Sequence, residues 1–241
     1  MSKARRKAEQ ARRAKVRRQK RILAAAVLVV IAAVAAVLIW NNQKKKEEAS
    51  AGDYTAEIAV KDYGTITVEL DGDAAPETVK NFVSLAESGF YDGLTFHRII
   101  DGFMIQGGDP NGDGTGGSEE TIPGEFSANG FDNPLSHTRG TISMARSQDY
   151  DSASSHSLST PFFHTRPWSQ DYDSASSQFF IMQEDTPSLD GQYAAFGHVT
   201  SGMEVVDAIC EDAVNGDANG VLPAEDQPVI ESITITDEKT E

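Results

Sequence analysis

The sequence predicts a mainly β domain, either a closed barrel or a sandwich, that is preceded by one N-terminal transmembrane helix. Three observations predict this class. Residues 22–40 contain no charged side chain. From residue 54 onward, short segments of alternating apolar and polar residues recur between glycine-rich connections, and only two segments carry the apolar spacing of a helix. Many short strands with few helices are typical of barrels and sandwiches, and periodicity alone does not separate the two.

Charge divides the chain of 241 residues into two parts. Residues 1–46 hold 14 of the 21 Lys and Arg residues and one of the 37 acidic residues, so the rest of the chain is strongly acidic. This acidity disfavours nucleic acid as a partner of the folded part, because binding to phosphates requires Lys and Arg. The single cysteine, Cys210, excludes an intramolecular disulfide and a zinc site built from several cysteines.

The apolar segment 22–40 has the length of a membrane span. As a helix it would extend about 28 Å, close to the ~30 Å hydrocarbon thickness of a bilayer. Eleven Lys and Arg residues precede it and three lysines closely follow it, an asymmetry that retains the N-terminus in the cytoplasm. We expect an uncleaved single-pass anchor in the cell membrane. A cleaved signal peptide is the alternative, because Ala49-Ser50-Ala51 resembles a cleavage site, although it lies well beyond the apolar segment.

These features give the expected organisation of the chain. The membrane segment contacts lipid, and the folded domain lies outside the cytoplasm, where we expect it to be monomeric. The parts are, in order, a basic cytoplasmic tail (1–21), the transmembrane helix (22–40), a polar linker (41–53), the folded domain (54–237) and a short tail (238–241).

The folded domain begins with a predicted β-hairpin and a helix. Segments 55–60 and 65–70 are rich in β-branched residues and are joined by the turn sequence 61–64. Residues 73–76 then open a helix with proline in its first turn, and Gly89 ends it. The apolar stripe of this helix consists of Val79, Phe82, Val83 and Ala86.

Short strands and one further helix make up the rest of the domain. The final segment, VIESITIT, alternates and is expected to close the domain as its last strand. Cys210, on a helix between Ile209 and Glu211, is expected to be a packed small residue. Strands are expected at 95–100, 103–107, 141–144, 179–182, 195–199 and 229–236, and the second helix at 203–209.

The nonapeptide SQDYDSASS occurs twice, at residues 147–155 and 169–177. A solenoid requires at least three repeats that each bury an apolar face, whereas this segment is polar. We interpret the repeat as a 22-residue duplication within one surface loop, which loops tolerate well. The first copy keeps its junction with Arg146 and the second runs directly into Gln178. Either copy could therefore occupy the original loop position, and we favour the second.

Four motifs follow one another in the folded domain. They are FHRIIDGFMIQGGD (96–109), GTISMA (140–145), SQFFI (177–181), and SLDG followed by AFGHV (188–199). In this order they resemble the cyclophilin-type peptidyl-prolyl cis–trans isomerases, over about residues 54–236. The resemblance implies a closed eight-stranded antiparallel β-barrel capped by two helices, which agrees with the pattern of strands and helices.

The activity of that family implies an enzyme that requires no cofactor, metal or nucleophile. Rotation about an X–Pro bond has a barrier of about 20 kcal/mol and takes tens to hundreds of seconds unaided. No bond is broken, so the catalyst has to bind the twisted amide more tightly than its planar forms. Arg98 matches the family's catalytic arginine, whose guanidinium can donate to the prolyl nitrogen and carbonyl. Phe103 and Gln106 complete the expected catalytic set.

The resemblance also implies a binding site for proline-containing polypeptide segments. Its apolar slot for the proline ring is expected to be lined by Phe103, Met104, Phe180 and Leu189, with Tyr193 at the rim.

Further residues are implied for the rest of the substrate. Gln106 is expected to bind the substrate backbone and to position Arg98. His97, next to Arg98 in the sequence, is expected among the substrate-binding residues. The residues that precede the proline are expected to bind along Ala145, Arg146 and Gln178.

This chain departs from the common pattern of the family at three of these positions. Ser188 stands where many relatives have tryptophan, Tyr193 where many have histidine, and Arg146 where asparagine is common. The duplicated loop also separates Arg146 from the later part of the same groove. The implied groove is therefore altered on one side, while the motif around Arg98 is intact.

The sequence gives weaker support to three other functions. Residues 109–120 fit the spacing of a calcium-binding loop, but neither flank reads as a helix, and no metal site is expected. The serines of the repeat lack a nucleophile-elbow motif, which argues against a hydrolase. The remaining alternative is a catalytically weak scaffold that binds proline-containing segments.

Overall fold

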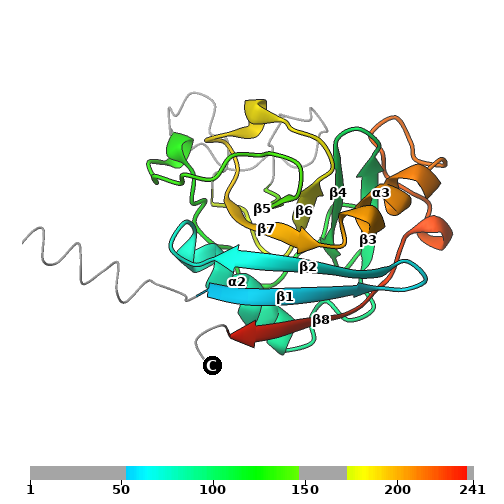
Figure 1. Cartoon of the computed structure of the whole chain (residues 1–241), viewed down its shortest axis with the longest axis horizontal. Helices are drawn as coiled ribbons and strands as arrows, with labels where there is room; N and C mark the ends of the chain where they lie inside the picture. The colour runs from blue at the N-terminus through cyan, green and yellow to red at the C-terminus, as the bar shows by residue number, and fades with distance from the viewer. Residues whose placement is uncertain (1–52, 147–172, 238–241) are drawn as a thin grey trace, which may run out of the picture. The chain divides into compact units, whose positions relative to one another are not determined.

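The computed structural model describes residues 53–146 and 173–237 (Figure 1). The expected cytoplasmic tail, transmembrane helix, C-terminal tail and most of the linker lie outside these residues, as does the first copy of the repeat. Within the described ranges, no helix is long and apolar enough to cross a membrane.

An antiparallel sheet and two α-helices form the described domain. Three short 3-10 helices, η1 (Ser127–Asn129), η2 (Pro187–Leu189) and η3 (Ala224–Asp226), lie in the connections. The strands are β1 (Asp53–Val60), β2 (Gly64–Asp71), β3 (Thr95–Ile100), β4 (Met104–Asp109), β5 (Thr141–Met144), β6 (Phe179–Met182), β7 (Ala195–Ser201) and β8 (Ile230–Asp237), and the α-helices are α2 (Pro76–Glu87) and α3 (Met203–Asp212).

The eight strands form one curled sheet in the order β3-β4-β6-β5-β7-β2-β1-β8 (Figure 1). At its two edges, β3 and the start of β8 meet through an isolated bridge between Thr95 and Val229. The N–H of Phe96 donates to the carbonyl of Pro228 at 2.9 Å, and that of Ile230 donates to Leu94 at 2.8 Å. Among the described residues, these contacts are not a continuous ladder between β3 and β8, so the sheet is a curled half-barrel and the expected closed barrel is not shown.

The strands and helices predicted for the folded domain all occur, with shifts at some of their ends. Strands β3, β5 and β6 match the expected ranges residue for residue. Strand β4 begins at Met104, one residue later than expected, because the N–H of Phe103 bonds back to Ile100 in a turn where Gly102 has a φ of +75°. Helix α3 runs to Asp212, three residues beyond the expected end.

The main core lies between the sheet and the two helices. The predicted stripe of α2 is buried throughout, and Phe82 at its centre contacts the rings of Tyr91, Phe179 and Phe196 at centroid distances of 5.2–5.4 Å. Such aromatic packing contributes large buried apolar areas. Cys210 is buried on α3, as expected of a packed small residue, and burial raises the pKa of its thiol to about 12.

The end of the second repeat copy is built into the domain. Ala175 is buried and pairs with Ile122 in an isolated bridge. The hydroxyl of Ser177 donates to the carbonyl of Gly108 at 2.7 Å, and Asn81 on α2 donates to the carbonyl of Ser176. These contacts hold the end of the second copy against the domain, and the first copy lies outside the described residues.

A buried carboxylate from a distant loop caps the N-terminus of α2. The residue at the N-cap, Ala75, has no side chain that can accept a hydrogen bond. The two carboxylate oxygens of Glu125 instead accept the N–H groups of Glu77 at 3.1 Å and Thr78 at 2.8 Å. Glu125 is 3% exposed and Thr78 is fully buried, so water does not replace the carboxylate at the Thr78 N–H.

We predict that removing this cap destabilises the domain. Glu125→Gln leaves one acceptor oxygen for two donors and should lower the free energy of unfolding by about 1 kcal/mol. Glu125→Ala leaves both donors unpaired and should lower it by about 2–3 kcal/mol. Urea unfolding of residues 51–241 measures both changes, with the exposed Glu120→Gln as the matched control. Equal stability of the three proteins would contradict the capping role.

Candidate functional site

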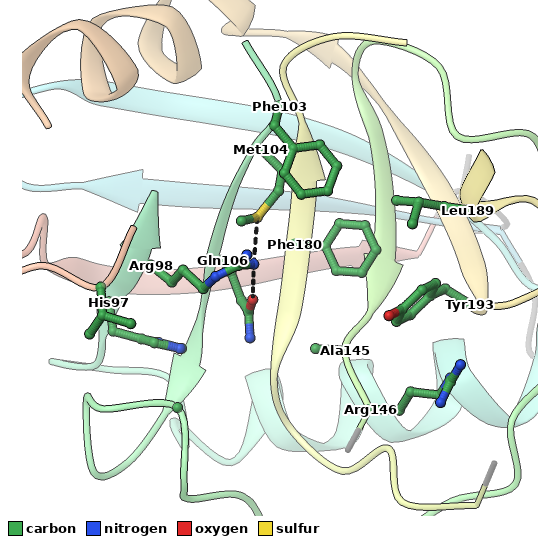
Figure 2. A pocket seen from close by; sticks show the side chains of 12 residues that line it. His97, Arg98, Phe103, Met104, Gln106, Ala145, Arg146, Phe180, Leu189 and Tyr193 are labelled. Atoms are coloured by element: carbon green, nitrogen blue, oxygen red, sulfur yellow. Dashed lines mark hydrogen bonds between the residues drawn. The ribbon is translucent and has the colours of Figure 1, made fainter. Parts of the chain in front are cut away.

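A pocket of about 450 Å³ opens where β3, β4, β5 and β6 meet the loop before β7 (Figure 2). Cationic, amide and apolar side chains face it from different strands, so it is built from segments far apart in the sequence. Its lining consists of His97, Arg98, Phe103, Met104, Gln106, Gly114, Ala145, Arg146, Phe180, Leu189, Tyr193 and Val221.

Arg98 projects from β3, and its guanidinium is held by acceptors on two sides. Nε donates to the carbonyl oxygen of Asn219 at 2.8 Å. Nη1 donates to Oε1 of Gln106 at 3.2 Å and lies 3.9 Å from Sδ of Met104 (Figure 2). Within the described part of the chain Nη2 makes no hydrogen bond, so this nitrogen can donate to a bound ligand.

The guanidinium keeps its positive charge despite being half-buried. Burial lowers the pKa of Arg98, and the neighbouring Tyr193 and Asp217 oppose that shift. An arginine pKa lies so far above neutrality that this lowering does not remove the proton. The pocket therefore holds a permanent cation with a fixed orientation.

A chain of amide hydrogen bonds fixes the orientation of Gln106. Its Nε2 donates to Oε1 of Gln178 at 2.8 Å, and Gln178 directly precedes the neighbouring strand β6. Gln178 in turn donates through Nε2 to the carbonyls of Gly114 at 3.1 Å and Gly116 at 2.7 Å. Because each amide oxygen accepts and each amide nitrogen donates, Gln106 has to present its oxygen to Arg98.

The apolar side of the pocket is a second hydrophobic cluster, separate from the main core. Successive strand residues face opposite sides of a sheet, so Phe179 joins the main core while Phe180 faces the pocket. Phe180 packs there with Met104 and Met182. Half-buried side chains surround these three and leave an apolar recess: Ile100, Phe103, Ala145, Leu189 and Tyr193.

Arg146 and Tyr193 form the rim on the side away from Arg98 (Figure 2). The guanidinium carbon of Arg146 lies 4.8 Å from the centre of the Tyr193 ring and 5.6 Å from that of Phe126. Nε of Arg146 also donates to the carbonyl of Gln192 at 2.9 Å. A cation over an aromatic face is a favourable contact. The rim is thus held together by its own side chains.

His97 forms part of the pocket wall and is fully buried. Among the described residues, neither ring nitrogen has a hydrogen-bond partner. Burial lowers the pKa of His97, and the nearby charge of Asp109 opposes that shift only in part. The ring is therefore neutral at pH 7, and Arg98 supplies the positive charge at this end of the pocket.

A buried histidine that was not expected at the site packs against Phe180, one of the residues that line the pocket. The ring of His137 is stacked on Phe180 at a centroid distance of 6.0 Å and an interplanar angle of 19°. Its Nδ1 lies 3.0 Å from Asp190 and its Nε2 lies 3.0 Å from the hydroxyl of Ser143. Since a carboxylate only accepts, Nδ1 donates and Nε2 accepts from Ser143. This arrangement fixes the ring beneath Phe180.

Of the eleven residues expected at the site, ten line this pocket. Gln178 instead lines a smaller polar pocket beside it, of about 130 Å³, which shares Gln106, Ala145 and Arg146 with the first. Sequence reasoning missed Asn219, Gly114 and Val221. Asn219 acts through its backbone carbonyl, Gly114 has no side chain, and Val221 lies in a connection, so none of them carries a sequence signal.

The loop whose spacing fits a calcium-binding loop uses its first carboxylate for hydrogen bonds within the loop. Oδ1 of Asp109 accepts the N–H of Asn111, and Oδ2 accepts those of Asp113 and Gly114, at 2.5–3.1 Å. Within residues 53–146 and 173–237, no group of three or more His, Cys, Asp or Glu side chains is arranged to hold a metal ion.

Comparisons with known proteins agree with this geometry. The family model described as cyclophilin type peptidyl-prolyl cis-trans isomerase matches residues 55–163 and 163–239. The chain is 40% identical over 163 residues to peptidyl-prolyl cis-trans isomerase B of Bacillus subtilis. The aligned residues cover 68% of this chain and 92% of that protein. It is 41% identical over 158 residues to a peptidyl-prolyl cis-trans isomerase of Helicobacter pylori, covering 64% of this chain and 81% of that protein.

A solved structure shows the same likeness. A cyclophilin type peptidyl-prolyl cis-trans isomerase of Cryptosporidium parvum, crystallised in the presence of the dipeptide Ala-Pro, aligns with a TM-score of 0.59 and 28% identity, over 76% of this chain and 98% of that one. The family match covers most of the chain and includes every strand that forms the pocket. This chain therefore belongs to the cyclophilin-type peptidyl-prolyl cis–trans isomerase family, which confirms the enzyme class that the sequence predicted.

Proposed function

We propose that this protein catalyses the cis–trans isomerisation of X–Pro bonds in polypeptide segments bound at the Arg98 pocket. The observation that carries the proposal is a permanently charged guanidinium whose Nη2 has no hydrogen-bond partner among the described residues, set beside an apolar recess lined by Phe103, Met104 and Phe180. The Cryptosporidium relative that was crystallised in the presence of Ala-Pro supports a proline-containing ligand for such a recess.

The recess accepts the proline ring, which is apolar and carries no hydrogen-bond donor. Phe180 and Met104 form its buried floor, and Phe103, Leu189 and Tyr193 surround it at half-buried positions. Burial of the ring against these side chains anchors one side of the X–Pro bond. The residue before proline then lies toward Ala145, Arg146 and Gln178, on the side of the smaller pocket.

Arg98 lowers the barrier by stabilising the twisted amide. When the bond rotates out of plane, resonance is lost and the prolyl nitrogen regains a lone pair that can accept a hydrogen bond. A donor already fixed in place stabilises this state without reorganisation, and the planar isomers gain less from it. Gln106 and the carbonyl of Asn219 hold the guanidinium so that its remaining N–H groups face the substrate. No covalent step or proton transfer is required.

We also propose that the enzyme acts outside the cytoplasmic membrane, on exported or cell-surface proteins. The charge asymmetry around residues 22–40 and their lack of charged side chains support this location. Slow X–Pro isomerisation limits the folding of many chains, so an isomerase at the membrane surface would accelerate the folding of newly exported proteins.

The first prediction concerns Arg98. Arg98→Ala removes the fixed donor and should lower kcat/KM for an Ala-Pro peptide by roughly 10²–10³-fold, the usual cost of losing such a donor. The exposed Lys80→Ala removes a positive charge outside the pocket and serves as the control. The rate is measured on residues 51–241. Peptide binding without turnover in both wild type and Arg98→Ala would support a scaffold in place of an enzyme.

The second prediction concerns the duplicated segment. Deletion of residues 147–168 joins Arg146 to the second copy of the repeat, whose end is already bound to α2 and to Gly108. We expect the shortened protein to fold and to retain isomerase activity within a few-fold, since a shorter loop costs less entropy to close. Circular dichroism and the same peptide assay measure this. An insoluble or inactive deletion protein would refute the duplication.

The third prediction concerns the membrane anchor. Full-length protein in isolated membranes should remain in the pellet after alkaline carbonate extraction, because an apolar helix of this length inserts stably in the bilayer. Residues 51–241, which lack the segment, should appear in the supernatant and provide the control. Release of the full-length chain by carbonate would contradict an integral anchor.

A further inference from the structure

A tight turn between α3 and η3 lies directly beside Arg98. Its first residue, Asp217, accepts the N–H of Asn219 at 2.7 Å and that of Val221 at 2.9 Å through Oδ1. The backbone of Asp217 closes the same turn, because its N–H donates to Val221 and its carbonyl accepts from Gly220, both at 2.9 Å. Four hydrogen bonds thus converge on one residue.

This turn is attached to β3 by its backbone. The N–H of Ile99 donates to the carbonyl of Gly220 at 2.8 Å, and the N–H of Leu222 donates to that of His97 at 2.9 Å. Gly220 has a φ of +82°, and a Cβ there would lie 2.6 Å from the carbonyl oxygen of Ile99. The approach is therefore so close that a side chain at this position would displace the turn from β3.

One carbonyl of the turn, that of Asn219, accepts Nε of Arg98 at 2.8 Å. Asp217 and Asn219 are both exposed, so their position does not come from apolar burial around them. Hydrogen bonds fix it instead: the backbone bonds to β3, and the bonds within the turn, of which the side chain of Asp217 supplies two. The same bonds lower the pKa of Asp217, which keeps its carboxylate ionised at neutral pH.

We propose that Asp217 is a positioning residue for the isomerase reaction: it holds the 217–221 turn, so that the Asn219 carbonyl orients the guanidinium of Arg98. Asp217 lines neither pocket and acts through Arg98. The inference rests on the proposed function for its kinetic consequence, and on the turn geometry alone for its structural consequence.

The kinetic test compares three substitutions in the full chain, purified in a mild detergent. Asp217→Ala removes the acceptor and should lower kcat/KM for an Ala-Pro peptide roughly three- to ten-fold, as expected for the loss of one positioning hydrogen bond. Asp217→Asn keeps an Oδ1 acceptor and should rescue the activity to within about two-fold of wild type. Glu225→Ala removes an exposed carboxylate of η3 nearby and should leave the activity unchanged.

The same substitution made in the Arg98→Lys protein tells whether Asp217 acts by positioning Arg98 or by a general effect on the structure. Arg98→Lys lacks the Nε–H group that Asn219 accepts, so adding Asp217→Ala to Arg98→Lys should cause no further loss. Wild-type activity in Asp217→Ala would overturn the proposal. An equal loss in Asp217→Asn, or a full additional loss in the Arg98→Lys background, would overturn it as well, because either result assigns the effect to charge or to the fold.

Hydrogen exchange measured by NMR spectroscopy tests the role of Asp217 without any measurement of catalysis. The Arg98 Nε–H resonance, identified by its absence in Arg98→Lys, should exchange slowly with water in wild type and Asp217→Asn and faster in Asp217→Ala. Unchanged exchange in Asp217→Ala overturns the proposal. If the wild-type protein does not isomerise proline peptides, the proposed function fails, and the exchange comparison still decides the role of Asp217.

Discussion

A guanidinium that leaves bulk water has to find acceptors in the protein, and this requirement shapes the whole site. The acceptors of Arg98 come from two directions: Gln106 on the adjacent strand β4, and Asn219 in a turn more than a hundred residues later. Neither direction is sufficient alone, because each fixes a different nitrogen. The cation is therefore placed only when the β3–β4 ladder and the backbone pairing of residues 217–222 with β3 have both formed.

The apolar recess follows from the same strands. Because a strand alternates its side chains, β6 contributes Phe179 to the main core and Phe180 to the pocket, so the recess needs no additional element. Beneath it, His137 is held between Asp190 and Ser143, and its ring supports Phe180. In the proposed mechanism this rigidity matters, because a recess that is formed before binding spends less of the binding energy on ordering its own side chains.

The sequence predicted the elements better than their connections. The strands expected as short apolar segments match β3, β5 and β6 to the residue, and the apolar stripe identified the buried face of α2. Contacts made by backbone groups cannot be predicted from residue types. The carbonyl oxygen of residue 219 accepts from Arg98, and a residue of another type would offer the same carbonyl. The role of His137 was not predicted, because its partner Asp190 lies 53 residues away and neither residue has the spacing of a ligand motif. Local patterns thus reveal which face a side chain takes, but not which distant segment meets it.

Two departures from the common family pattern are explained together by the rim. Arg146 replaces a common asparagine and Tyr193 a common histidine, and in this chain the guanidinium of Arg146 lies over the Tyr193 ring. Either change alone would place a cation or a large ring at the rim without this contact, whereas the pair stabilises both side chains. Among the described residues, the hydrogen bonds of Arg98 involve neither residue. The chain therefore departs from the family pattern at the rim, while the side that carries Arg98 has the contacts on which the proposed chemistry depends.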